Sequence, residues 1–190
     1  LDSNLKRKVN FALGGFNIEG NYFYKRLAFD YSHGANLQFS SEILGGAYQE
    51  QGLKGKLPWT TGFGVGYRFN TWLNVRVEPK WHRFEISYED APEGISAKVV
   101  DYTTFTLGLG VYANLRPFKN NKSKFLSGLM VAPSIRYWPK VSSTLKGDQF
   151  TYDNAVTGQA ETIEALEVGI SNTPWVFNIS IGYSFPIKKN

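Results

Sequence analysis

The sequence predicts an all-β protein, a closed antiparallel up-and-down β-barrel of about eight strands that forms one domain over residues 1–190. Large apolar residues recur at every second position through most of the chain, which is the period of a β-strand. The chain also holds 19 glycines and 16% aromatic residues, a composition typical of short strands and tight turns. It has no cysteine, so neither a disulfide scaffold nor a cysteine-ligated metal is expected.

The two-residue period defines the strands in order. They are expected over 11–24, 27–39, 59–69, 73–81, 104–115, 127–138, 163–171 and 175–185, with the first and seventh weaker than the rest. Most reach about ten residues, the length that a tilted strand needs to cross a bilayer. The connections alternate in length, since those at 24–26, 70–71, 116–123 and 171–174 are short, whereas 40–57, 89–98 and 139–162 are long. Strands joined in this way favour a closed meander, which leaves no edge unpaired.

Residues 58–81 raise the question of which face of the sheet is inside. One face of this stretch is large and apolar, and the other carries glycines together with Arg68, Arg76, Glu78 and Lys80. A soluble lipocalin-like barrel or a sandwich would bury the apolar face. The polar positions here are mostly Gly, Thr, Ser and Asn, which suit a crowded interior better than a solvated surface. The sequence therefore favours a membrane barrel with its apolar face toward lipid.

Aromatic residues near the strand ends support the same interpretation, because such rings gather at the two membrane interfaces. The expected girdle comprises Trp59, Trp72, Trp138, Trp175, Tyr137 and Tyr183.

The closing run WVFNISIGYSF resembles the terminal strand signal of small eight-stranded outer-membrane β-barrels of Gram-negative bacteria, including the Bacteroidetes type of barrel domain. The resemblance implies an integral outer-membrane location. It also implies that the barrel-assembly machinery reads Phe177, Ile179, Ile181, Tyr183 and Phe185. The sequence departs from many members of that family in that PIKKN follows the aromatic residue.

Charged residues on the inward positions are expected to neutralise one another, because an unpaired buried charge is too costly. The expected lumen charge network comprises Asp30, Arg68, Arg76, Glu78, Lys80 and Arg136. An eight-stranded barrel is just wide enough for side chains to fill, so this cluster is expected to be a structural plug and not a conducting pore.

His33 and His82 are the two histidines, and neither carries a clear catalytic pattern. His33 lies on the expected lipid face, opposite Ser32 across the strand, and a residue near the interface or a bulge at Gly34 accounts for it. Two histidines far apart are a weak case for metal, and no cofactor is expected. GFGVG lies inside a strand and is not a phosphate loop. The net charge of +5 without a Lys/Arg stripe gives no reason to expect nucleic acid as a partner.

The expected function is that of a non-enzymatic accessory or structural subunit of an outer-membrane assembly. The alternatives are a deacylase-like enzyme acting on lipid A through His33 or His82, and a narrow porin-like channel. The expected partners are outer-membrane lipid, lipopolysaccharide, and other outer-membrane or periplasmic proteins.

An eight-stranded count places the tight turns outside the cell and the long connections in the periplasm, which reverses the ordinary pattern. Lys25, Arg26, Arg116 and Lys119 would then face lipopolysaccharide. The other possibility is that one strand is misplaced.

Overall fold

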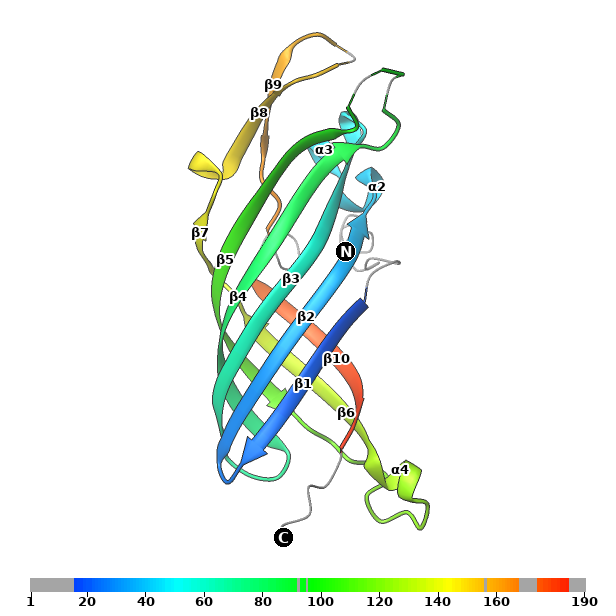
Figure 1. Ribbon diagram of the computed structural model, residues 1–190, viewed down its shortest axis with the longest axis vertical. Coiled ribbons are helices and arrows are strands. Elements are labelled where there is room, and N and C mark those ends of the chain that lie inside the picture. The colour runs from blue at the N-terminus through cyan, green and yellow to red at the C-terminus, as the bar shows by residue number, and fades with distance from the viewer. Residues whose placement is uncertain (1–15, 92, 95, 156, 168–173, 185–190) are drawn as a thin grey trace, which may run out of the picture.

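In a computed structural model, which describes residues 16–91, 93–94, 96–155, 157–167 and 174–184, the chain is mostly antiparallel β-structure. Its main feature is a large sheet that curls into a half-barrel (Figure 1). The strands of its continuous path are β1 (Phe16–Tyr24), β2 (Leu27–Phe39), β3 (Leu53–Arg68), β4 (Leu73–Tyr88), β5 (Lys98–Ala113), β6 (Leu129–Tyr137) and β10 (Trp175–Tyr183).

Each strand of the path pairs antiparallel with the next, in the order β1-β2-β3-β4-β5-β6-β10. The short β7 (Lys140–Ser143) pairs with β5 beside β6. The β1–β2 turn is a two-residue loop in which Lys25 has φ 53°, the left-handed conformation that tight hairpins favour. Figure 1 shows this turn and the β3–β4 turn at one end of the molecule, here called the lower end. The helices α2 and α3 and the β8–β9 hairpin lie at the other, upper end.

Of the strand expected over 163–171, the described residues form a strand only at 163–164, and that strand lies outside the large sheet. The strand β9 (Ala160–Glu164) pairs with β8 (Gln149–Asp153) in a separate two-stranded sheet, and β6 is followed in the large sheet by β10. Residues 168–173, and the part of the first expected strand before Phe16, lie outside the described residues. Among the described residues no pairing joins β1 to β10.

The inward face of β4 changes character along the strand. Its even-numbered residues are buried throughout, and they are polar or charged from Asn74 to His82 but apolar from Phe84 onward. The outward face makes the opposite change, since it is apolar up to Trp81 and polar or charged from Arg83 to Ser87. The sheet therefore has a lower half with polar residues inside and an upper half with apolar residues inside.

The strand β3 makes the same change through a β-bulge. Leu57 and Pro58 together oppose Phe84 of β4, so one extra residue is inserted. Below the bulge the even-numbered residues turn inward, and above it the odd-numbered Leu53 and Leu57 are buried instead. Asn36 of β2, with φ 56°, marks the same switch in the neighbouring strand.

The upper half is closed by a small cap. The helices α2 (Ser41–Leu44) and α3 (Gly46–Glu50) and the β8–β9 hairpin cover its inward face. The buried core consists of Tyr48, Leu53, Leu57, Phe84, Ile86, Tyr88, Tyr102, Phe150, Ile163 and Leu166. Within the described residues no helix has the length and apolar character needed to cross a membrane.

Two buried tyrosine hydroxyls hold the cap in place, one joining α3 to β9 and the other joining β5 of the large sheet to the segment after β9. The Tyr48 hydroxyl donates to the Glu164 carbonyl at 2.6 Å, and the Tyr102 hydroxyl accepts from the Leu166 amide at 2.7 Å. Burial raises the pKa of Tyr48 and of Tyr102, so both phenols stay neutral and keep their donor hydrogens.

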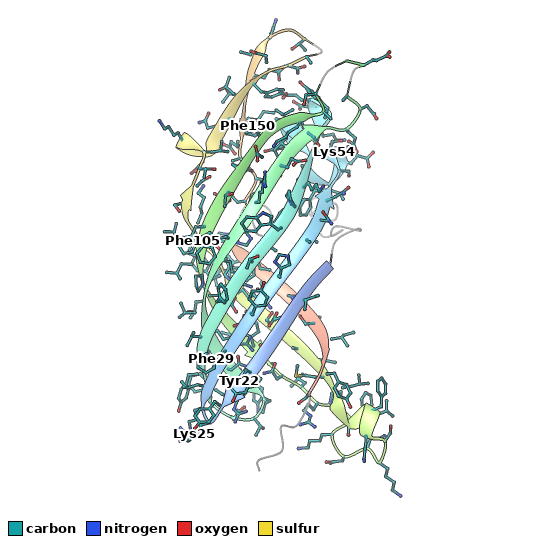
Figure 2. The ribbon with its side chains drawn as sticks, viewed as in Figure 1. Tyr22, Lys25, Phe29, Lys54, Phe105 and Phe150 are labelled. Carbon is teal, nitrogen blue, oxygen red and sulfur yellow. The ribbon has the colours of Figure 1, made fainter. Side chains whose placement is uncertain are left out.

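The outward face of the lower half is covered by exposed apolar side chains, including Tyr22 and Phe29 (Figure 2). The others on this face are Ile18, Tyr31, Phe63, Val65, Tyr67, Val77, Leu107, Leu109, Val111, Ile135, Phe177, Ile179 and Ile181. Trp81 and Phe105 end this surface on β4 and β5, with ring centroids 5.0 Å apart. Just above them the outward face carries an ion pair of 2.7 Å between Arg83 and Asp101. Monomeric soluble proteins rarely expose apolar side chains over a continuous surface of this extent.

Candidate functional site

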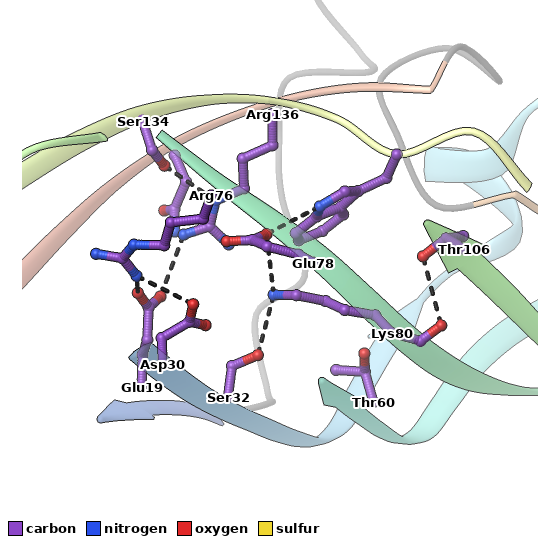
Figure 3. Close-up of polar contacts among 12 residues, drawn as sticks. Glu19, Asp30, Ser32, Thr60, Arg76, Glu78, Lys80, Thr106, Ser134 and Arg136 are labelled. Carbon is purple, nitrogen blue, oxygen red and sulfur yellow. Dashed lines mark hydrogen bonds and ion pairs between the residues drawn. The ribbon is translucent and has the colours of Figure 1, made fainter. Parts of the chain in front are cut away.

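The interior of the lower half holds a cluster of buried charges, here called the interior network. It comprises Glu19 of β1, Asp30 of β2, Arg76, Glu78 and Lys80 of β4, and Arg136 of β6 (Figure 3). Strand alternation brings them together, because successive inward positions on β4 lie two residues apart. The three carboxylates and three cations have no net formal charge.

Glu19 links the two arginines across the interior. Its carboxylate lies 3.3 Å from Arg76 Nη1 and 3.1 Å from Arg136 Nη2, one oxygen to each. Arg76 also donates through Nε to Asn74 Oδ1 at 2.7 Å, and Arg136 donates through Nε to Ser134 Oγ at 3.1 Å. Both guanidinium groups are thus held by several hydrogen bonds, as buried charges require.

Glu78 is the centre of a second set of contacts. Its carboxylate accepts hydrogen bonds from the Tyr112 hydroxyl and, at 3.0 Å, from Trp138 Nε1. Lys80 Nζ lies 3.7 Å from Glu78 Oε2 and donates to Ser32 Oγ at 2.9 Å. The Lys80 ammonium also lies 4.2 Å from the Trp138 ring centroid, which is cation–π geometry.

The Tyr112 ring joins the two sets. The guanidinium carbons of Arg76 and Arg136 lie 4.0 and 4.7 Å from its centroid, so the ring lies between two cations while its hydroxyl binds Glu78. Asp30 is the least satisfied member. Its contact is the 3.4 Å ion pair with Arg76, and it accepts no hydrogen bond within the described part of the chain.

Glycines make room for the long inward side chains. A Cβ on Gly62 would overlap the Lys80 stem, one on Gly64 would overlap the Asp30 carboxylate, and one on Gly108 would overlap the Trp138 ring. The interior is therefore packed with side chains at these levels, and the polar groups of the network are directed at one another.

Two residues lie elsewhere than the sequence predicts. Arg68 is outside the network, because it sits at the lower end of β3, where it donates to the Lys25 carbonyl at 2.9 Å and stacks on Phe23. Trp138 is not part of an outward girdle, since it is 7% exposed and points inward to Glu78. Strand alternation explains the second error, because Tyr137 faces outward and the next residue must face inward.

The remaining girdle residues lie on the surface. Tyr137 and Trp175 are exposed neighbours with ring centroids 4.9 Å apart, and Trp72 is exposed at the β3–β4 turn. Trp59 is partly exposed next to the bulge, and Tyr183 packs against Phe125. Phe177, Ile179 and Ile181 of the expected assembly signal are exposed on β10, whereas Phe185 lies outside the described residues.

The two histidines each contact threonines. His82 is buried between Thr60 Oγ1 at 2.7 Å and Thr106 Oγ1 at 3.0 Å, above the interior network. His33 is on the outward face, where Nδ1 lies 2.8 Å from Thr61 Oγ1. Within the described part of the chain, each imidazole contacts threonine hydroxyls and forms no hydrogen bond with a carboxylate.

Four expected surface cations lie at the lower end. Lys25 and Arg26 occupy the β1–β2 turn (Figure 2 labels Lys25), and Arg116 and Lys119 lie in the β5–β6 connection. That connection carries the short helix α4 (Lys124–Gly128), whose Phe125 is exposed. An apolar depression of about 480 Å³ lies nearby, against Val111, Pro133, Ile135 and Phe177 among others, and no charged group lines it.

Sequence reasoning missed the network member Glu19 and the two aromatic residues Tyr112 and Trp138 that donate hydrogen bonds to Glu78. Each occupies an inward position by alternation with exposed neighbours, such as Ile18 beside Glu19 and Val111 beside Tyr112. The alternation was therefore the signal that could have found them.

By its fold and its interior network, the chain is an antiparallel curled-sheet protein whose lower half has a polar interior and an apolar exterior. No family model, curated protein or solved structure matches this chain.

Proposed function

We propose that the chain is an integral outer-membrane protein of a Gram-negative bacterium. In this proposal the lower half of the sheet closes into a transmembrane β-barrel with a plugged interior. The protein acts without catalysis, as an accessory or structural subunit of an outer-membrane complex.

The observation that carries this proposal is the exchange of polar and apolar faces at one level of the sheet. On β4 the apolar outward stretch Leu73–Trp81 extends about 26 Å along the strand, or about 20 Å along the axis at a 40° tilt. This is near the roughly 25 Å apolar band of membrane barrels. The charged outward residues above it, such as Arg83 and Asp101, would lie in water.

The interior network supports a plugged and non-conducting barrel. Its formal charges balance, and all of its members except Asp30 form hydrogen bonds with one another or with adjacent interior side chains. The apolar core of the upper half lies above it and would close that end of the interior. A binding or catalytic site would instead aim polar groups at a vacant space.

The accessory role is supported by the upper half. Its core and cap would stand clear of the bilayer as a folded unit with a polar outward face, which offers a partner a fixed surface. The partner class proposed is another outer-membrane or periplasmic protein, together with the surrounding lipid.

The plug is tested by recording conductance across planar bilayers that contain the purified protein. The unaltered protein is expected to give no stable steps, and Tyr112→Ala/Trp138→Ala, which removes two of the largest interior side chains, is expected to conduct. Tyr31→Ala, on the outward face, is the matched control and should stay silent. Stable steps from the unaltered protein would support the channel alternative and overturn the plug.

The accessory role is tested by extracting the tagged protein in a mild detergent and identifying what copurifies by mass spectrometry. We expect one stoichiometric membrane or periplasmic protein. Recovery as a free monomer contradicts the subunit role, and a change in lipid A mass when the gene is deleted would favour the enzymatic alternative.

A further inference from the structure

The apolar depression lies in the outward face of the lower half, across the three strands β5, β6 and β10. Its lining includes the exposed side chains of Val111, Ile135, Phe177 and Ile179. The strand registers align Val111, Ile135 and Phe177 in one row, because Ile135 pairs with each of the other two. The depression is therefore a feature of the surface that would face lipid.

Small side chains in the next row down produce this depression. Ala113 and Pro133 stand opposite each other, two residues up the strands from the paired Leu115 and Val131. Proline has no N–H to donate, and the named pairing of β5 with β6 is interrupted at this level and resumes at Leu115. Two small residues thus lie between rows of larger ones, which leaves a space of about 480 Å³ without a charged group in its lining.

The β5–β6 connection below the depression carries charge of one sign. Residues 114–128 include Arg116, Lys119, Lys122 and Lys124 and contain no aspartate or glutamate. All four cations are exposed, and none of them forms an ion pair with another described residue. An anion from outside the chain would therefore meet no competing carboxylate of this connection.

Hydrogen bonds hold the connection close to the depression. Arg116 donates through Nη2 to the Ser127 carbonyl at 3.1 Å, and the Tyr183 hydroxyl at the lower end of β10 donates to the Lys124 carbonyl at 3.0 Å. Arg116 follows Ala113 by three residues, or about 10 Å of extended chain. The cations and the depression are thus near enough for one amphiphilic molecule to contact both.

We infer that the depression and the basic connection together bind one anionic glycerophospholipid, with an acyl chain in the depression and the phosphate at the cations. The inference rests on the proposed function, because it needs the outward face to meet lipid, and it deepens that function by naming a specific bound lipid. The uncharged lining suits a hydrocarbon chain. Basic residues at a membrane surface attract anionic headgroups.

The lengths of the connections favour a glycerophospholipid over lipopolysaccharide as the occupant. The tight β1–β2 and β3–β4 turns lie at the lower end, as does the basic connection, whereas the cap lies at the upper end (Figure 1). Short turns face the periplasm and longer loops face outward in bacterial barrels. The lower end would then meet the periplasmic leaflet, which consists of glycerophospholipid. This orientation differs from that of the eight-strand count, which placed 163–171 in the large sheet.

Native mass spectrometry of the purified, delipidated protein in detergent tests the inference. The probes are dioleoyl phosphatidylglycerol, which is anionic, and dioleoyl phosphatidylcholine, which has no net charge. The unaltered protein is expected to bind one phosphatidylglycerol at least about tenfold more tightly than phosphatidylcholine, because each nearby cation contributes roughly fivefold.

Two pairs of variants separate the charge from the depression. Arg116→Gln/Lys119→Gln should weaken phosphatidylglycerol binding by about 25-fold, at roughly fivefold for each cation. Lys25→Gln/Arg26→Gln removes the same charge at the same end of the molecule and should leave the affinity unchanged. Ala113→Phe fills the depression and should weaken binding of both lipids, whereas Val65→Phe, on the outward face of β3, should not.

Equal affinity for the two lipids would overturn the inference, and so would equal losses in a variant and its control. Copurification of lipopolysaccharide in place of phospholipid would also overturn it. A second measurement uses the unaltered protein, in case the variants do not fold. In phosphatidylcholine vesicles, a phosphatidylglycerol with a diazirine on its acyl chain should label residues 111–115, 131–135 and 177–181 most strongly, and even labelling of the outward face contradicts the inference. An integral protein without this lipid preference would refute the inference alone, since the proposed function is decided by the conductance and copurification results.

Discussion

An arginine scan along the outward face of β4 tests where the bilayer lies. Val77 is 50% exposed midway along the apolar stretch Leu73–Trp81, whereas Ser87 is on the same face in the upper half. At the bilayer midplane an arginine costs about 2–4 kcal/mol. Since 1.4 kcal/mol is tenfold, Val77→Arg should lower the folded-to-unfolded ratio by roughly 30- to 700-fold. Leu73→Arg, near the lower interface, should cost about 0–1 kcal/mol.

The free energy of unfolding is measured by denaturant titration of the protein folded in lipid vesicles, followed by tryptophan fluorescence. Ser87→Arg should stay within about 0.5 kcal/mol of the unaltered protein, as substitutions at ordinary surfaces do. Val77→Thr keeps the branched shape without the charge and separates packing from the cost of burying a charge in lipid. Equal costs for Val77→Arg and Ser87→Arg would refute the reasoning, because a water-exposed sheet would treat the two positions alike.

Three further predictions concern the interior and the upper half. Glu78→Leu should lower the free energy of unfolding by about 3–5 kcal/mol, because it leaves the buried Lys80 ammonium without its counterion. In the same denaturant titration, the double variant Glu78→Leu/Lys80→Met should recover part of that loss, because it removes the unpaired charge as well. Gly64→Val should destabilise the fold, judged by heat-modifiable migration on gels, because the buried Asp30 carboxylate would have to move away from Arg76 to admit the new Cβ. Gly20→Val has open space and should fold as the unaltered protein does. Hydrogen bonds from Lys98 and then Arg83 lower the pKa of Asp101. The ionised Asp101 carboxylate therefore stabilises the fold fully above its unfolded pKa near 4, and this stabilisation is lost as the pH falls through the lower pKa of the folded state. Amide exchange in β5 should accordingly become faster on acidification, and Asp101→Asn should make the exchange rate depend less on pH.

The lower half could be predicted from sequence because its alternation is strict. The inward glycines and charges of β3 and β4 lie where the two-residue period places them. Trp138 was misplaced although that period already assigned it, as the neighbour of Tyr137, to the interior. Arg68 was misplaced for another reason, since alternation gives the face of a residue but not its level along the curled sheet.

The upper half could not be predicted in the same way, because its period stays the same while its apolar face changes sides. On β4 the apolar residues are odd-numbered up to Trp81 and even-numbered from Phe84, and this change was taken for the end of the strand. The strand β9 was assigned to the large sheet because a local period does not identify the partner. Ile163 alternates because it packs against the upper core, with β8 as its neighbour.

Because of the bulge at Leu57 and Pro58, the number of residues in β3 decides which of its side chains face inward. Deleting one residue there would rotate Lys54 and Lys56 toward the upper core, or turn Gly62 and Gly64 out of the interior, because each step along a strand reverses its faces. Viable length changes in this strand would have to come in pairs, or be matched by a compensating change at Asn36 of β2. The two halves of the sheet, one with an apolar and one with a polar outward face, are thus coupled by the parity of residue number along the strand, which a single inserted or deleted codon would change.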